Sequence, residues 1–221
     1  MGFSRRLETP YYRKLHGLDF SQVQSDLKDY CLNHEDYKSV RLLENWWQIY
    51  PELSPDLLEK VPSLPKFFEQ LGLTVGMFAF FQCNNRVSAI HVDQPDVPMH
   101  YIGNCRARIN IPIMNCENST TCFYTSTGEE IIREIPATSR GGKSEDETLN
   151  AGYFDPSLCT KVDEFNLDVP TVFRVDVPHN VIVDGFKFPR IAATIGFYED
   201  PTPLLESNEL VQNLQGVSVS T

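Results

Sequence analysis

The chain of 221 residues lacks any apolar run of about 18 residues, which excludes a transmembrane helix formed by one continuous apolar segment. Basic residues are scarce: 19 Lys and Arg stand against 30 Asp and Glu, and the formal net charge is -11. A broad nucleic-acid-binding face needs clustered cations that neutralise phosphates, so nucleic acid is a disfavoured partner. The same shortage of cations disfavours a polybasic membrane anchor, and we expect no membrane partner.

Cysteine motifs are also missing. The six cysteines include no Cys-x-x-Cys spacing, which disfavours a zinc knuckle. Residues 1–8 turn polar at once and contain no apolar signal core, so we expect a cytoplasmic protein with reduced thiols.

What is present is the ordinary composition of a folded domain. Hydrophobic residues make up 41% and charged residues 22% of the chain, and no internal repeat divides it. A chain of this length can bury a substantial core. We expect one domain over residues 1–221, with a helical N-terminal layer over 1–72, a β core over 73–200 and a tail over 201–221.

Helix signals concentrate in the first third of the chain. The spacing predicts a helix over 20–32 with a serine or aspartate cap, and an arm or edge strand before it. A second helix is predicted over 54–60, with proline at the first helical position. A third is predicted over 64–71, and Gly72 ends it.

From Leu73 onward the pattern changes to strands. Segments with β-branched and aromatic residues or period-two alternation are 74–81, 87–93, 104–113, 120–125, 162–167, 171–176, 177–183 and 188–197. About eight short strands without βαβ alternation predict a mainly β fold, a double-stranded β-helix, or jelly roll, of the cupin type.

Two connections carry signals of their own. The polar stretch 137–150 predicts a mobile surface loop that can act as a lid. Asp184-Gly185 is a hairpin signal, so we expect Arg190 to lie on a strand paired with the strand that contains His179.

A small set of residues indicates metal chemistry. His91 and Asp93 stand two positions apart on a predicted strand, so their side chains point to one face. With His179 from another strand, two imidazoles and a carboxylate can occupy one face of an octahedral Fe(II) and leave three positions open. Arg190 can hold the far carboxylate of a bidentate acid on that metal. His-x-Asp alone is weak, because a loop histidine beside a capping aspartate has the same pattern.

This set, in a strand-rich chain, resembles the Fe(II)/2-oxoglutarate-dependent dioxygenases. Arg106-x-Arg108-x-Asn110-Ile111-Pro112 is similar to the corresponding strand of the aspartyl/asparaginyl- and proline-hydroxylase-like branches. The resemblance covers roughly residues 75–198. It departs from the aspartyl hydroxylase branch, which lacks the acidic ligand that Asp93 supplies here.

The resemblance implies a role for each residue. The metal ligands, also the catalytic residues, are implied to be His91, Asp93 and His179. Arg190 would bind the distal carboxylate of 2-oxoglutarate, and Arg108 and Asn110 would lie near its metal-bound end. Thr121 and Tyr124 are further candidates for hydrogen bonds to it. The implied cofactors are Fe(II) and 2-oxoglutarate, with ascorbate in the assay. The implied reaction hydroxylates an amino acid or a peptidyl residue and releases succinate and carbon dioxide.

Two other functions fit the same residues. A cupin-like metal protein without oxygenase activity, such as an isomerase or lyase, has no need of an arginine placed for a dicarboxylate, so Arg190 disfavours it. A catalytically silent jelly roll used as a binding module would retain clustered, unpaired ligands at a cost in stability. The sequence leaves the substrate, a small molecule or a peptide, and the oligomeric state open.

Overall fold

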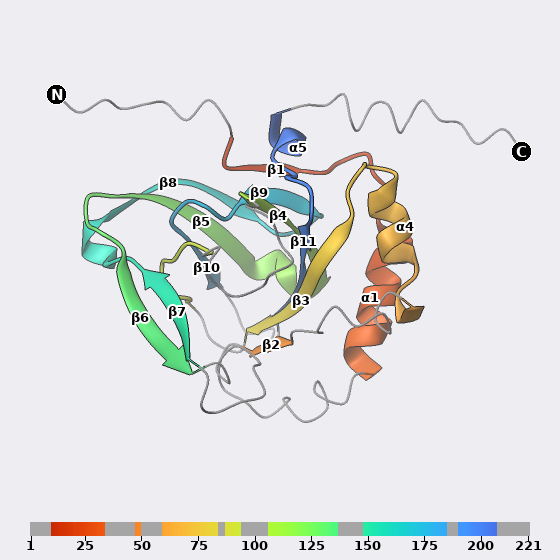
Figure 1. Cartoon of the computed structure of the whole chain (residues 1–221), viewed down its shortest axis with the longest axis horizontal. Coiled ribbons are helices and arrows are strands. Elements are labelled where there is room, and N and C mark those ends of the chain that lie inside the picture. The colour runs from red at the N-terminus through yellow and green to blue at the C-terminus, as the bar shows by residue number, and fades with distance from the viewer. Residues whose placement is uncertain are drawn as a thin grey trace, which may run out of the picture.

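The structure is a computed structural model that describes residues 10–33, 47–49, 59–83, 87–93, 106–136, 148–184 and 190–206. Over these ranges the chain is mainly β, with antiparallel sheets and few helices (Figure 1). The prediction of a mainly β fold is confirmed, whereas the jelly roll itself stays a prediction. No helix within these ranges is long and apolar enough to cross a membrane.

A six-stranded sheet forms the centre of the described chain. Its strands are β1 (Tyr12–Lys14), β2 (Trp47–Ile49), β3 (Val75–Cys83), β4 (Ala107–Met114), β9 (Thr171–Arg174) and β11 (Arg190–Phe197). They follow the order β1-β9-β4-β11-β3-β2, so the expected edge strand near the N-terminus is present as β1. All eight residues of β11 are buried, as suits a central strand with a neighbour on each side.

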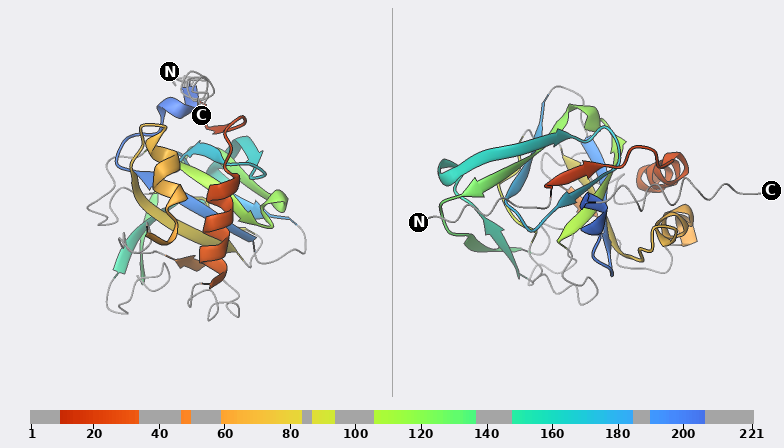
Figure 2. Two further views of the ribbon diagram at one scale, coloured as in Figure 1. Left: turned by 90° about the vertical axis from the view of Figure 1, so that its right-hand side faces the viewer. Right: turned by 90° about the horizontal axis from the view of Figure 1, so that it is seen from above.

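Two helices, α1 (Ser21–Asn33) and α4 (Ser63–Glu69), cover one face of this large sheet (Figures 1 and 2). They confirm two of the predicted helices. Gly72 ends the second at a φ of 70°, a left-handed conformation that glycine adopts without strain. Of the third predicted helix, only Glu59 and Lys60 are described, and both are helical. The apolar core between helices and sheet includes Leu27, Leu64, Phe68, Ile109, Ile111, Ile195 and Phe197.

A smaller sheet lies on the other side of the large one (Figure 1). Its strands are β5 (Ser119–Ser126), β8 (Cys159–Asn166) and β10 (His179–Val183), in the order β10-β5-β8. A hairpin of β6 (Ile131–Pro136) and β7 (Thr148–Tyr153) stands beside it. The predicted strand over 87–93 has only single bridges at Val87 and His91, and His91 bridges both Tyr153 and His179. Residues 87–93 therefore connect the hairpin to β10.

A second core fills the space between the two sheets. Phe123 and Phe165 from the small sheet meet Phe173 and Ala192 from the large sheet. Tyr12 adds an aromatic ring whose centroid is 4.7 Å from that of Phe165. The interior that holds the predicted site is therefore bounded by aromatic and apolar side chains.

The expectation that Arg190 lies on a strand paired with β10 is wrong. β10 pairs with β5 in the small sheet, whereas β11 pairs with β3 and β4 in the large sheet. The chain thus changes sheets between Val183 and Arg190, and residues 185–189 lie outside the described ranges. The physical reason is burial: all eight residues of β11 are buried, which suits a strand in the middle of the large sheet, whereas β10 is partly exposed and lies at the edge of the small sheet.

Two other expectations need correction. The hairpin strands β6 and β7 were not predicted, and β7 begins at Thr148, within the expected loop 137–150; residues 137–147 lie outside the described ranges. The expected tail from 201 includes a short helix, α5 (Pro203–Glu206). Leu204 and Leu205 are buried there and α5 packs on β1 and β9, because this leucine pair gains free energy by leaving water.

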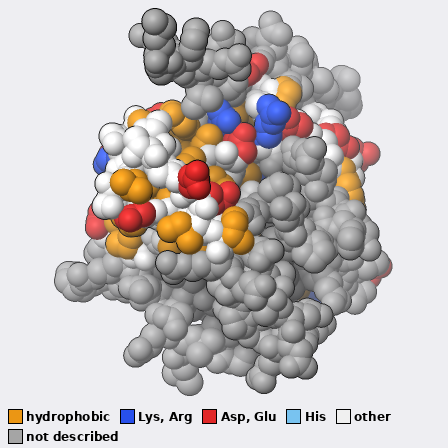
Figure 3. Space-filling model, turned by 60° about the vertical axis from the view of Figure 1, so that its left-hand side comes forward, with side chains coloured by type: hydrophobic (Ala, Val, Ile, Leu, Met, Phe, Trp, Pro, Cys, Tyr) orange, Lys and Arg blue, Asp and Glu red, His pale blue; other side chains and the backbone are white. Residues whose placement is uncertain are grey.

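Ion pairs occur on the surface of the described residues. Three basic side chains are paired with acidic ones, namely Lys14 with Asp168, Lys161 with Glu164 and Arg174 with Asp176. On the face in Figure 3, hydrophobic and acidic side chains are interspersed, and the described residues form no broad basic area.

Phe68→Ala should lower the free energy of unfolding by about 3–5 kcal/mol, because it empties a fully buried site next to Phe197. Phe67→Ala is the matched control: this neighbouring ring is only partly buried, so its loss should cost roughly half as much. Urea unfolding followed by circular dichroism measures both values. Equal losses would contradict the packing described here.

Candidate metal centre

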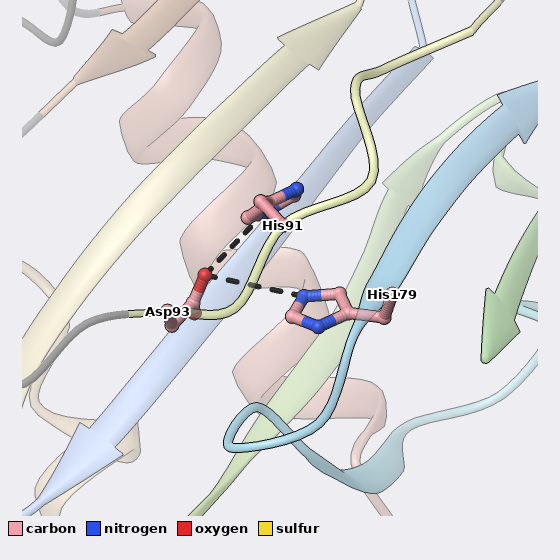
Figure 4. Close-up of side chains that lie close together, drawn as sticks. All are labelled: His91, Asp93 and His179. Carbon is pink, nitrogen blue, oxygen red and sulfur yellow. Dashed lines mark ion pairs between the residues drawn. The ribbon is translucent and has the colours of Figure 1, made fainter. Parts of the chain in front are cut away.

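His91, Asp93 and His179 converge in the interior (Figure 4). Each offers one ligand atom, and these atoms all lie within 4.8 Å of one another. Oδ1 of Asp93 is 3.5 Å from Nε2 of His91 and 3.9 Å from Nε2 of His179. The structure therefore brings together the three residues that the sequence predicts as metal ligands.

Backbone hydrogen bonds hold these residues in place. His91 and His179 donate to each other's carbonyl oxygens over 2.9 and 2.8 Å, so they are a hydrogen-bonded antiparallel pair with side chains on one face. The amide of Asp93 donates to the carbonyl of Val175, just beyond β9, over 2.9 Å. Residues 91–93 thus cross from the small sheet to the large one, and the aspartate meets the histidines from the other side.

Both imidazoles are oriented by carbonyl oxygens. Nδ1 of His91 lies 2.8 Å from the carbonyl of Ala89, and Nδ1 of His179 lies 2.9 Å from that of Val177. Because a carbonyl oxygen only accepts, the proton of each neutral ring sits on Nδ1 and the lone pair is on Nε2. Two nitrogen lone pairs and a carboxylate oxygen then face one another, an arrangement that a cation stabilises.

The pKa shifts favour the metal-binding forms of these groups. Burial, together with the nearby imidazole of His91, lowers the pKa of His179 to about 4, so its ring is neutral at neutral pH. Burial alone would raise the pKa of Asp93, but the guanidinium of Arg108 and the two imidazoles hold it well below its ordinary value. Metal ligands must be deprotonated, and both groups are.

Aromatic rings enclose His179, whose exposed fraction is 4%. Phe173 meets its ring edge-on, with centroids 5.8 Å apart, and Phe123, directly opposite on β5, lies at 6.4 Å. Sequence reasoning missed both residues as parts of the site. Their only sequence signal is that both lie on predicted strands, and strand alternation does not reveal which sheet face meets which.

Arg108 contacts a metal ligand. Its Nη1 lies 2.7 Å from Oδ2 of Asp93, and its Nε is buried with no hydrogen-bond partner among the described residues. The sequence places Arg108 near the metal-bound end of a co-substrate. The structure places it at the same end of the site, with its guanidinium against the carboxylate of Asp93.

Arg190 lies farther along the interior and is 1% exposed. Its Nε donates to Oγ of Ser119 over 3.3 Å, while Nη2 is buried without a partner among the described residues. Ser119 and Phe123 share one face of β5, and Phe123 is opposite His179. Ser119 and Phe123 are four residues apart on this strand, a distance of about 13 Å. Sequence reasoning missed Ser119, although its alternation with Thr121 was visible.

Polar side chains also lie between the two ends. Asn110 shares a strand face with Arg108, and its Oδ1 accepts a hydrogen bond from the hydroxyl of Thr194 over 2.6 Å; both residues are buried. Thr121 is buried on the face of β5 that carries Ser119. Tyr124 instead donates to Oδ1 of Asn180, on the opposite face, which removes it from the interior.

The donor set fits a divalent transition metal. Two imidazole nitrogens and one carboxylate suit an ion such as Fe(II) with positions left open for other ligands. The carbonyl oxygens behind both imidazoles are the outer partners that metal-binding histidines usually have. The residues present therefore fit the implied iron.

Comparisons with known proteins find distant structural similarity only. No protein-family model matches the chain, and no curated protein does. The structure is similar to the non-heme alpha ketoglutarate dependent epimerase SnoN from nogalamycin biosynthesis, at 14% identity and a TM-score of 0.46, over 90% of this chain and 84% of that one. It is also similar to a Pseudomonas putida prolyl-4-hydroxylase (14%, TM-score 0.39, 84% and 90%) and to iron-bound HygX from Streptomyces hygroscopicus (11%, TM-score 0.41, 86% and 82%).

In the metal-free protein, Asp93→Ala should lower the free energy of unfolding by about 1–3 kcal/mol, because it leaves the Arg108 guanidinium without its partner. The matched control is Asp176→Ala, which breaks the more exposed pair with Arg174 and should cost less than about 1 kcal/mol. Urea unfolding in the presence of a chelator measures both. A larger loss in the control would contradict this account of the site.

Proposed function

We propose that the protein is a non-haem iron oxygenase that uses 2-oxoglutarate. The observation that carries this proposal is the convergence of His91, Asp93 and His179 with their three ligand atoms within 4.8 Å. Two imidazoles and one carboxylate would supply three ligands, and this pattern suits Fe(II) chemistry that needs open positions.

Arg190 supports 2-oxoglutarate as the co-substrate. Its buried Nη2 has no hydrogen-bond partner among the described residues, and a buried charged donor needs an acceptor. A short dicarboxylate bound to the metal at one end would present its second carboxylate toward this guanidinium, beside Ser119. Between the metal ligands and Arg190 lie the buried polar side chains of Thr121, Asn110 and Thr194.

Each residue then has a defined task. The imidazoles of His91 and His179 and the Asp93 carboxylate hold the metal, and Arg190 orients the co-substrate through a charge-assisted pair. Phe123 and Phe173 exclude water from the side of His179. When bound, the iron and 2-oxoglutarate would supply the activation of oxygen, with release of succinate and carbon dioxide.

The reaction outcome that we propose is hydroxylation of an amino acid or a peptidyl residue. A cupin-like isomerase or lyase would use the same three ligands but would leave the buried Arg190 without a function. A silent binding module would use neither feature. The oxygenase accounts for both ends of the interior.

Succinate formation from 2-oxoglutarate with Fe(II), ascorbate and oxygen tests the function directly. Wild type should show slow turnover without added substrate, and His179→Ala should reduce it to background, since one of three ligands is lost. Co(II) binding should weaken on the order of 100-fold or more in the same variant. His16→Ala, in an exposed turn after β1, is the control and should match wild type. Wild type that binds no Co(II) would refute the proposal.

Arg190→Met should weaken 2-oxoglutarate binding to the Co(II)-loaded protein by about 10–150-fold, because a charge-assisted pair of about 1.5–3 kcal/mol is lost. Co(II) binding itself should change less than about threefold, since no ligand is removed. Equilibrium dialysis with labelled 2-oxoglutarate measures the first and dye competition the second. Arg174→Met, which breaks a pair with Asp176 and removes no metal ligand, is the control. Parallel loss of both affinities would contradict the role of Arg190.

A further inference from the structure

We infer that Arg108 is a positioning residue that fixes the Asp93 carboxylate so that only one of its oxygens reaches the metal. This inference rests on the proposed metal site and goes beyond it by assigning a task to a residue that is not among the proposed metal ligands. The two oxygens of Asp93 have different surroundings. Oδ1 faces Nε2 of both histidines, at 3.5 and 3.9 Å, while Oδ2 lies 2.7 Å from Nη1 of Arg108.

This division of the two oxygens has a chemical consequence. A carboxylate that is free to turn can bind a metal through one or both oxygens, and the second oxygen then takes a further coordination position. A guanidinium on Oδ2 competes for that oxygen and sets the plane of the carboxylate. Asp93 would then offer a metal only Oδ1, and this would leave coordination positions free for other ligands.

The arginine is well placed to act as a fixed support. Its flanking residues, Ala107 and Ile109, are fully buried in the core beneath the helices, so the strand that carries Arg108 is anchored on its other face. β4 is hydrogen-bonded on both sides, to β9 and to β11. The side chain of Arg108 is only 13% exposed, which restricts the orientations available to its guanidinium.

The same strand register also serves His179. Arg108 lies directly opposite Phe173 in the β4–β9 pair, and Phe173 packs edge-on against the His179 ring. Asp93 is tied to Val175, whose amide donates to the carbonyl of Arg106 over 2.9 Å. One stretch of the large sheet therefore supports the carboxylate directly and one imidazole through an aromatic ring.

The charge of Arg108 and its positioning role predict opposite effects on metal affinity when the arginine is removed, so an experiment can separate them. Removing a cation close to the metal reduces repulsion and should tighten metal binding. Removing the residue that supports a ligand should weaken metal binding, and loss of such an outer partner typically costs 10–100-fold in metal affinity.

The test is Co(II) binding to the full-length protein, measured by competition with a chelating dye and by the visible spectrum of bound Co(II). Arg108→Gln should weaken binding by about 10–100-fold and change the spectrum. Arg108→Lys keeps the charge and one donor on a flexible stem, so its loss should be smaller, about threefold to tenfold. Arg174→Gln is the matched control, because Arg174 is also 13% exposed and also pairs with an aspartate; it should match wild type.

Each result decides the matter. Arg108→Gln that binds Co(II) as tightly as wild type, or more tightly, with an unchanged spectrum would overturn the positioning role and leave the metal site intact. If circular dichroism shows that this variant does not fold, Arg108→Lys decides instead, and wild-type affinity and spectrum in that variant would overturn the role. Wild type that binds no Co(II) would remove the metal site itself, which separates failure of the proposed function from failure of this inference.

Discussion

The site depends on one crossing of two chain segments. His91 and His179 exchange backbone hydrogen bonds, and the amide of Asp93 reaches the carbonyl of Val175. Residues 91–93 and 175–178 are short segments outside the named strands, so neither could hold its place alone. The hydrogen bonds between these segments place the ring centroids of the two imidazoles 4.6 Å apart, with the Asp93 carboxylate opposite them.

Charge is the second constraint. Arg190 is buried, and Asp93 and Arg108 are half-buried beside an aromatic and apolar core, where an isolated charge would be costly. Asp93 and Arg108 compensate each other over 2.7 Å, whereas Arg190 donates to a serine hydroxyl and its Nη2 has no hydrogen-bond partner among the described residues. Among the described residues the Arg190 end of the interior is therefore cationic, which suits the acidic co-substrate that we propose.

The large sheet provides the rigidity that both ends need. β11 is buried along its whole length and is hydrogen-bonded to β3 and β4, so Arg190 and Thr194 project from a strand that is held on both sides. The helices α1 and α4 cover the opposite face and close the first core (Figure 2). The second core then packs around the site, so the residues that bind and the residues that support are held by the same close packing.

Sequence alone determined the mainly β character, the helices α1 and α4, and the candidate ligands, because periodicity, caps and the His-x-Asp spacing are local properties. It could not decide that β11 pairs with β3 and β4 rather than with β10, because strand pairing depends on contacts between residues far apart in the chain. Nor could it show that Arg108 meets Asp93 or that Arg190 meets Ser119. Those contacts join residues far apart in the chain, and only the crossing of the two sheets brings them within hydrogen-bonding distance.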